Sequence, residues 1–192
     1  MKHETYFIGI DLGKQSSYFV IKNEMGILQK QMKVLNNKIS IEQLLMSFKE
    51  FNLKVVMEAT TNYYWMYQTL ESLGCEVVLA HPLKTRAIAD AKVKNDRLDA
   101  NILCDLLRGD LIPRSYIPTE RIRFLRELVR QRIRLVQMRT QIKNQIHALL
   151  TKLNYQSEQS DLFGTKGKQW LAALSLPDVF RFECDQLLKQ LE

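Results

Sequence analysis

The stretch from Tyr6 to Gly13 constrains the fold of this chain more than any other, because its apolar run ends on a carboxylate. Five apolar residues within a short run, with a glycine among them, predict a buried strand near the N-terminus. An unpaired buried carboxylate costs several kcal/mol or takes up a proton. Asp11 is therefore expected where the strand emerges, next to a cation or a phosphate. A carboxylate that caps a turn explains this short motif equally well when it is taken alone.

Composition limits the class of protein. A chain of 192 residues with 46% hydrophobic content suits one domain with an appendage. No apolar run approaches the ~18 residues that a membrane span needs, and the N-terminus lacks the cleavage pattern of a signal peptide. The three cysteines are far apart and lack zinc spacing, which predicts buried thiols in a reducing compartment. We therefore expect a cytoplasmic protein without a membrane partner.

The order of the predicted elements indicates a mixed α/β sheet. Strands over 16–21 and 27–34 follow short turns and favour an antiparallel meander. Strands over 54–58 and 75–80 flank an aromatic helix over 63–73 that Gly74 ends, which gives a parallel pairing with a right-handed crossover. A capping box of Ser40 and Gln43 predicts a helix to about Phe51. Further helices are expected over 83–91 and from about 96 to Gly109.

The segment 119–153 contains neither Gly nor Pro and predicts one helix about 50 Å long. Its apolar residues follow alternating steps of three and four, with arginine at two positions of the seam, which is typical of a coiled coil. The partner helix would come from a second copy or from a returning segment; a single amphipathic helix packed on its own domain is the alternative. The seam comprises Leu125, Leu128, Arg132, Leu135, Arg139, Ile142, Ile146, Leu149 and Leu153.

The same segment carries the basic character of the chain. It holds nine basic residues against two acidic ones, an excess equal to the net charge of +7 of the whole chain. Arginine prevails over lysine and suits bidentate contacts with phosphates, so we predict salt-sensitive nucleic-acid binding. A solvated coiled-coil flank is the alternative. The candidate residues are Arg121, Arg123, Arg126, Arg130, Arg134, Arg139 and Lys143.

Four carboxylates form the candidate catalytic and metal site. Asp11 and Glu58 each end a predicted strand, and Asp96 and Asp99 share one face at the start of a helix. Such a cluster would repel itself unless divalent cations neutralised it, and Mg²⁺ is favoured, with Mn²⁺ as a substitute. Two ions about 4 Å apart would support phosphodiester cleavage. Lys94 and Arg97 are the expected phosphate anchors. Taken singly, each acid has a structural explanation as a helix cap or a helix-dipole partner.

These residues carry a family resemblance. Gly9-Ile10-Asp11, Met57-Glu58-Ala59-Thr60 and Lys94-Asn95-Asp96-Arg97-Leu98-Asp99-Ala100 resemble motifs of the DEDD transposases of bacterial insertion sequences, a family that includes the Piv-type invertases. The resemblance covers roughly 6–153. It implies a RuvC-like, ribonuclease-H-type fold and magnesium ligation by the four acids. It also implies DNA recombination, guided in some members by a structured bridge RNA.

The sequence differs from the usual family pattern at two positions, and it ends before the family's second domain. The family usually has glycine where this chain has Thr61, and Asn95 replaces a common threonine. Family members continue into a second domain that supplies a serine, whereas this chain ends at Glu192. We therefore expect an N-terminal fragment that binds metal and nucleic acid without completing strand exchange. Its parts would be a RuvC-like DEDD catalytic domain (1–115), a long basic coiled-coil helix (116–155), and a linker with the start of a truncated region (156–192).

Three other functions remain open from the sequence. Asp11-Leu12-Gly13-Lys14 resembles the first phosphate loop of actin-like and sugar-kinase ATP-binding proteins, although the second such loop is not found in the sequence. A junction resolvase or nuclease would use the same fold and metals for simple hydrolysis. A non-enzymatic nucleic-acid-binding coiled coil would rely on the arginine helix alone.

Overall fold

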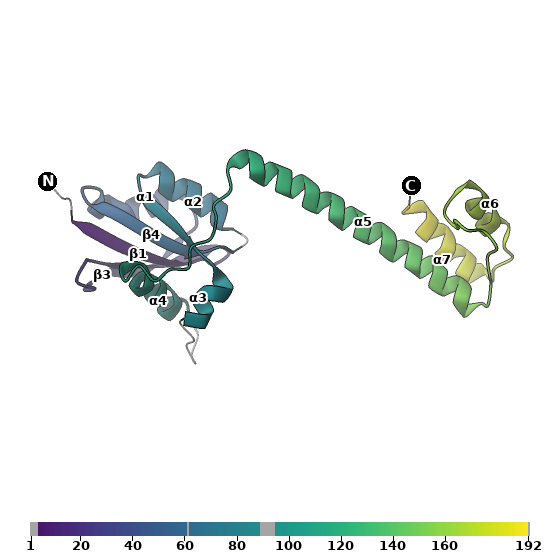
Figure 1. The fold of residues 1–192 in the computed structure, drawn as a ribbon, viewed down its shortest axis with the longest axis horizontal. Coiled ribbons are helices and arrows are strands. Elements are labelled where there is room, and N and C mark those ends of the chain that lie inside the picture. The colour runs from purple at the N-terminus through teal and green to yellow at the C-terminus, as the bar shows by residue number, and fades with distance from the viewer. Residues whose placement is uncertain (1–3, 61, 89–94, 192) are drawn as a thin grey trace. The chain divides into compact units, whose positions relative to one another are not determined.

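A five-stranded mixed sheet forms the centre of the first part of the chain (Figure 1). The computed structural model describes residues 4–60, 62–88 and 95–191 and falls into two units, Met1–Ile117 and Pro118–Glu192. The first unit contains, in chain order, β1 (Thr5–Asp11), β2 (Ser16–Lys22), β3 (Leu28–Leu35), α1 (Lys38–Leu45), the 3-10 helix η1 (Met46–Phe48), β4 (Asn52–Glu58), α2 (Tyr63–Ser72), β5 (Glu76–Ala80), α3 (Pro82–Ile88) and α4 (Asp96–Arg108).

The strand order is β3-β2-β1-β4-β5. β1, β2 and β3 pair antiparallel, whereas β1, β4 and β5 run parallel. The register places Ile10 beside Met57 and Glu58 beside Ala80, so the carboxyl ends of three parallel strands meet at one edge of the sheet. The predicted mixed α/β sheet flanked by helices is confirmed.

Side chains of β1 alternate between two layers. Ile8 and Ile10 are fully buried in a core that α1 and α2 cover. α4 lies on the opposite face, where Leu103 is buried against β4 and β5. Alternate residues of a strand share a face. Asp11 therefore lies on the same side of the sheet as α4.

The start and end of α1 differ from the prediction. Asn37 caps this helix in place of Ser40, because the Asn37 side chain accepts a hydrogen bond from the Ser40 backbone N–H at 2.8 Å. Asparagine is as good an N-cap as serine, and it comes two residues after β3 ends. The helix then ends at Leu45 and continues as η1. The predicted end of α2 is confirmed, since Gly74 follows it with a φ of +81°.

The second unit is built on the long helix predicted from 119–153. It contains α5 (Glu120–Lys152), α6 (Thr165–Ala173) and α7 (Asp178–Lys189), and α7 returns to pack on α5. The last third of α5 joins α6, α7 and the residues between them in one apolar core. This core comprises Ile146, Leu149, Leu150, Leu162, Leu171, Leu176, Cys184 and Leu187.

The prediction of a polar linker over 156–168 is wrong in part. Leu162 is buried and Gly167 lies inside α6. A Cβ at Gly167 would lie 2.2 Å from the carbonyl oxygen of Leu162, so this glycine permits close packing. The glycine here allows α6 to pack closely on the backbone at Leu162. A composition rich in glycine and polar residues does not distinguish such packing from a linker.

Two expectations about the environment of the chain can be compared with the described residues. None of the helices in the described ranges combines the length and apolar character that a bilayer crossing requires. All three cysteines are free and buried, as predicted. Burial raises the pKa of Cys75 and of Cys104 to about 11, so both thiols stay protonated near neutral pH.

Candidate active site

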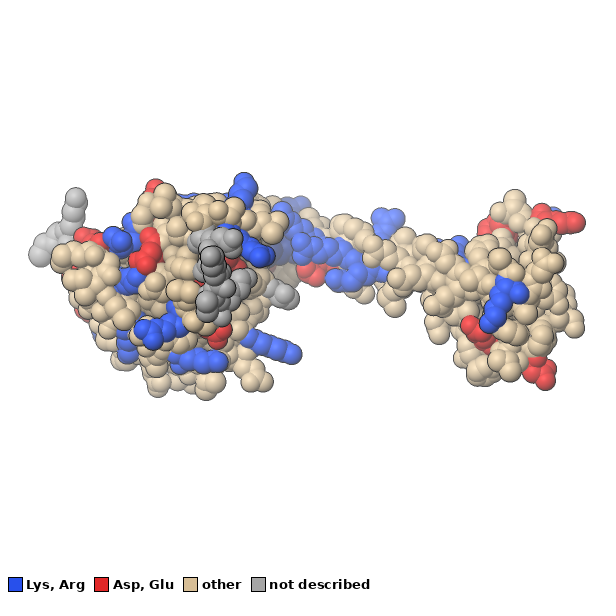
Figure 2. Space-filling model, turned by 90° about the horizontal axis from the view of Figure 1, so that it is seen from below, with Lys and Arg blue, Asp and Glu red and all other residues tan. Residues whose placement is uncertain are grey.

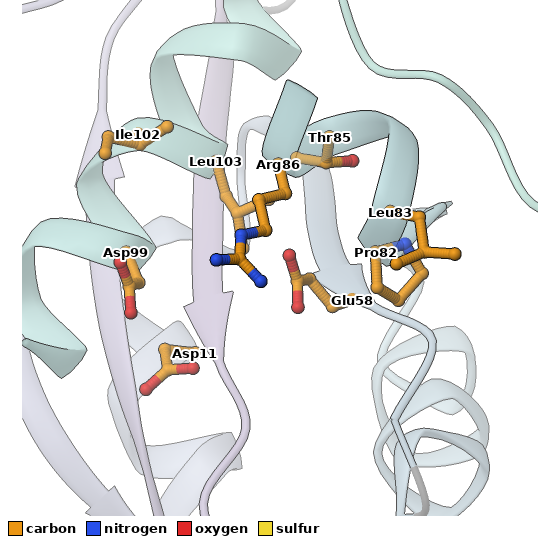
Figure 3. Close-up of a pocket in the computed structure, with 9 residues that line it drawn as sticks. All are labelled: Asp11, Glu58, Pro82, Leu83, Thr85, Arg86, Asp99, Ile102 and Leu103. Carbon is orange, nitrogen blue, oxygen red and sulfur yellow. The ribbon is translucent and has the colours of Figure 1, made fainter. Parts of the chain in front are cut away.

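Two carboxylates lie next to each other at the carboxyl ends of neighbouring parallel strands. Asp11 is the last residue of β1 and Glu58 is the last residue of β4. Because Ile10 pairs with Met57, the acids that follow them are adjacent. Figure 3 shows both side chains directed into one cleft.

α4 brings a third carboxylate to this edge because it packs on β1 with no space for a side chain between them. A Cβ at Gly9 would lie 2.0 Å from the carbonyl oxygen of Ala100 and 2.6 Å from the backbone nitrogen of Cys104. The Cys104 thiol also donates a hydrogen bond to the carbonyl oxygen of Phe7 at 3.1 Å. This close approach places Asp99, next to Ala100, above the end of β1.

The first turn of α4 supplies the fourth carboxylate and is well capped. The Asn95 side chain accepts a hydrogen bond from the Leu98 backbone N–H at 2.8 Å. Asparagine and threonine both serve as N-caps, so Asn95 in place of the family's common threonine retains the cap. Asp96 and Asp99 lie in this first turn, where the helix dipole favours negative charge.

An ion pair further along α4 fixes this helix to the sheet. The Lys22 ammonium lies 2.7 Å from both carboxylate oxygens of Asp105. The Lys22 side chain is only 10% exposed, whereas that of Asp105 is 42% exposed. A buried ammonium needs a partner, so this pair restricts where α4 lies on β2.

The loops after β1, β3 and β4 meet at one backbone carbonyl. The Gly13 oxygen accepts hydrogen bonds from the side-chain amides of Asn36 at 3.0 Å and Asn62 at 2.8 Å. Asn62 follows β4 and Asn36 follows β3. The turn after Asp11 is thereby tied to the loop after Glu58, which holds the two strand-end acids in fixed relation.

The pKa of Asp11 responds to the negative charges of the other three acids. Burial, first, and then the charges of Asp96, Asp99 and Glu58 raise the pKa of Asp11 from 3.8 to about 6. Desolvation and neighbouring negative charge both disfavour an ionised carboxylate. A pKa raised by burial and by specific neighbours, at a cleft, is typical of a functional site.

The cleft also contains a residue that sequence reasoning missed. Arg86, in α3, points its guanidinium into the cleft that Asp11, Glu58 and Asp99 line (Figure 3). Its sequence signal was available, because α3 begins directly after the third parallel strand and so must start at the same edge of the sheet. The full lining comprises Asp11, Glu58, Pro82, Leu83, Thr85, Arg86, Asp99, Ile102 and Leu103.

The chemistry of the donors fits a hard divalent cation, because four carboxylates converge and one has a raised pKa. The arrangement itself is open. Within the described ranges, no three His, Cys, Asp or Glu side chains are grouped closely enough to hold a metal ion as they stand.

The basic candidates fall in two places. Arg97 is exposed in the first turn of α4, and Lys94 lies outside the described residues, as does Thr61. The other seven candidates lie along α5, in the second unit; Figure 2 shows Lys and Arg side chains along this helix. Among them, Arg130 pairs with Glu127 at 3.2 Å and Arg134 contacts Gln131 at 2.9 Å. The structure therefore groups the acids in one unit and most of the arginines in the other.

A family of transposases matches most of this chain. The family model for DEDD transposases of the IS110 type, described as "Transposase", matches residues 8–155. The transposase for insertion sequence element IS1533 of Leptospira borgpetersenii is 30% identical over 137 residues, which cover 69% of this chain and 39% of that protein. A curated relative from Sinorhizobium fredii is 25% identical over 158 residues, covering 76% of this chain and 38% of that protein. The chain thus spans about two fifths of the length of the curated relatives it matches.

A solved structure shows a weaker likeness. The chain is similar to T. thermophilus RuvC in complex with a Holliday junction substrate, with a TM-score of 0.38 and 13% sequence identity. The match covers 57% of this chain and 99% of that chain.

Proposed function

Because the chain belongs to the DEDD transposase family of IS110-type insertion sequences, we propose that its first unit is the metal-dependent DNA-cleaving part of such a transposase. One observation carries the proposal: Asp11, Glu58 and Asp99 line one cleft, and Asp96 is close enough to raise the pKa of Asp11. Carboxylates gathered in this way favour a divalent cation.

The four acids have distinct places in this proposal. Asp11 interacts with each of the other three and is the central ligand, with Glu58 beside it on the sheet and Asp96 and Asp99 above it on α4. Bound Mg²⁺, with Mn²⁺ as a substitute, would activate a water or hydroxyl and stabilise the leaving oxygen of a phosphodiester. The Gly13 hydrogen bonds and the packing of α4 at Gly9 hold the ligands on rigid elements.

Nucleic-acid contacts are assigned to basic residues outside the cleft. Arg97 and Lys94 flank Asp96 in sequence and would anchor the DNA strand at the acids. The arginines of α5, with Lys143, would contact further phosphates of DNA or of a structured bridge RNA. The whole reaction would be strand cleavage and exchange during transposition, in the cytoplasm.

A second copy of the chain is the expected partner of α5. Leu125, Leu128 and Leu135 of the heptad seam are 53%, 68% and 55% exposed, whereas Ile146 and Leu149 are covered by α6 and α7. The returning segment therefore accounts for one end of the predicted seam. Pairing with another α5 would cover the other end.

Two measurements test the proposal. Isothermal titration of the 192-residue chain with Mn²⁺ should detect binding that Asp11→Asn removes, while Glu42→Gln, an exposed acid on α1, leaves it unchanged. The full-length transposase should then convert branched DNA into rejoined products in Mg²⁺. Products that are nicked and never rejoined would favour the resolvase or nuclease function, and recombination that survives Asp11→Ala would leave only a binding role for this unit.

A further inference from the structure

Backbone hydrogen bonds at the start of α3 place Arg86 at the cleft. β5 ends at Ala80, and α3 begins two residues later. The His81 N–H donates to the carbonyl oxygen of Pro113 at 2.8 Å, and the Thr85 N–H donates to the carbonyl oxygen of His81 at 2.9 Å. Thr85 is 3% exposed. The residue that follows it is thereby held at the sheet edge where the acids lie.

The charge of Arg86 is unusual in its setting. It is the one basic residue among the described residues that line the cleft, and three of the others are acids. Figure 3 shows its guanidinium directed toward the space that Asp11, Glu58 and Asp99 surround. The described part of the chain contains no ion pair or hydrogen bond to this guanidinium, although it lies near carboxylates. Its donors are therefore available to another group.

A cation beside a proposed metal site has opposite effects on two ligands. It repels a divalent ion that binds to the acids, so it is a poor addition to a site meant for metal alone. It attracts a phosphate, and a guanidinium matches two phosphate oxygens with parallel hydrogen bonds. A site that must hold both metal and phosphate gains from such a donor because the phosphate brings negative charge with it.

We propose that Arg86 binds a non-bridging oxygen of the DNA phosphate that is held at the four acids. This assignment depends on the proposed function and adds to it a phosphate-contacting residue on α3. It also distinguishes Arg86 from Lys94 and Arg97, which belong to the sequence motif of Asp96 and Asp99. The role requires metal to be bound, because only then does the phosphate lie at the acids.

The test compares Arg86→Gln with Arg86→Lys and with a control, Lys84→Gln. Lys84 is an exposed basic residue on the same helix and does not line the cleft. Fluorescence anisotropy with a labelled DNA duplex of about two helical turns would give the affinity of the 192-residue chain for DNA in Ca²⁺, chosen to limit cleavage, and again in EDTA. Titration calorimetry without DNA would give the Mn²⁺ affinity of each variant.

For Arg86→Gln, we expect the DNA affinity in Ca²⁺ to fall about tenfold, with a much smaller change in EDTA. Its Mn²⁺ affinity should stay the same or increase. Arg86→Lys should retain part of the Ca²⁺-dependent affinity, and Lys84→Gln should behave like the wild type.

Three results would overturn the assignment. Arg86→Gln could retain the wild-type affinity for DNA in Ca²⁺, or it could lose affinity equally in Ca²⁺ and in EDTA. Either result would show that Arg86 does not contact the metal-bound phosphate, while the proposed function stands. A loss of Mn²⁺ binding in both Arg86 variants would make the residue structural. A wild-type chain that shows neither Mn²⁺ binding nor metal-dependent DNA binding would overturn the proposed function and this assignment with it.

Discussion

Gly9 of β1 and Ala100 of α4 are in backbone contact, since a Cβ on Gly9 would come within 2.0 Å of the Ala100 carbonyl oxygen. The contact lies two residues before Asp11 and one residue after Asp99. The spacing between the first and last acids of the site is therefore set by a glycine that has no polar group of its own.

Gly9→Ala should separate α4 from β1 or prevent folding. We expect a loss of at least about 2–3 kcal/mol in the free energy of unfolding, because backbone atoms cannot give way as a flexible side chain can. Gly109→Ala is the control, since its nearest atom would lie at 3.4 Å, an ordinary contact. Urea denaturation of both variants measures the difference. Equal stabilities would show that α4 can move away from Gly9 at little cost.

Asp105→Ala should destabilise the chain more than Lys22→Met. Removing the carboxylate leaves an ammonium that is 10% exposed without its partner, which costs about 2–3 kcal/mol after allowance for the partly exposed carboxylate. Lys22→Met leaves a carboxylate that water already reaches. Arg108→Ala is the control, because its contact with Asp105 at 3.9 Å is loose and exposed and should contribute less than about 1 kcal/mol. Thermal and urea unfolding would rank the three, and the reverse order for Lys22 and Asp105 would contradict the burial argument.

The raised pKa of Asp11 predicts how the stability of the metal-free chain varies with pH. Burial and three neighbouring carboxylates raise this pKa to about 6, above its value of 3.8 without them. Between these pH values the folded chain holds a proton on Asp11 that the unfolded chain has lost. The contribution of Asp11 to stability is therefore fully present below about pH 4 and is lost as the pH rises through about 6. Asp11→Asn removes the titrating group.

In EDTA at a pH of about 7.5, Asp11→Asn should exceed the wild type in free energy of unfolding by about 1–3 kcal/mol, whereas the two should be similar near pH 4. Urea denaturation at both pH values measures this difference. Added Mn²⁺ should stabilise the wild type alone. A less stable Asp11→Asn at the higher pH would mean that Asp11 is paired favourably in the metal-free chain.

Replacing Arg123, Arg130 and Arg134 by Gln should weaken the salt dependence of nucleic-acid binding. Removal of one phosphate-binding side chain reduces the slope of log K against log salt by about 0.9 for duplex DNA, so three such arginines correspond to a change of about 2–3. Lys166, Lys168 and Lys189, outside α5, form a matched triple for the control. Anisotropy over a series of salt concentrations gives both slopes. An unchanged slope in the arginine triple would place the phosphate-binding residues elsewhere.

Leu128→Glu with Leu135→Glu should abolish self-association through α5. Both side chains lie in the seam and are more than half exposed, and carboxylates there would be desolvated on pairing. Ile133→Glu is the control, because Ile133 is also exposed but lies off the seam. Sedimentation equilibrium of the three proteins gives their association constants. Self-association that persists in the Leu variant would place the interface on another surface.

Short apolar runs bounded by turn residues made the sheet predictable, and the acids at its edge followed from it. Asp11 and Glu58 end strands that are clear in the sequence, and parallel pairing brings their ends together. The Gly9 contact was not predictable, because a glycine in a strand also fits a turn or a bulge. The place of α3 was predictable, because this helix follows the third parallel strand and starts at the same edge of the sheet, but nothing in 82–88 shows that the Arg86 side chain enters the cleft.

Local rules failed where two residues competed for one role. Ser40 and Gln43 formed a good capping box, but Asn37 came first and was an equally good cap. In the second unit, the Gly and polar residues of 156–168 resemble a linker, and only the apolar end of α5 gives Leu162 a place to be buried. Such a partnership between distant segments has no local signature.

The shared core at the end of α5 has a consequence for exchange of segments between relatives. Ile146, Leu149 and Leu150 lose their cover if the chain is divided after Tyr155, and the helices beyond lose most of their apolar support. A chimaera that keeps α5 from one parent and takes α6 and α7 from another would join two apolar surfaces that evolved in different proteins. These surfaces would then have to pack together in one core. The last third of α5 and everything that packs on it should be inherited as one piece.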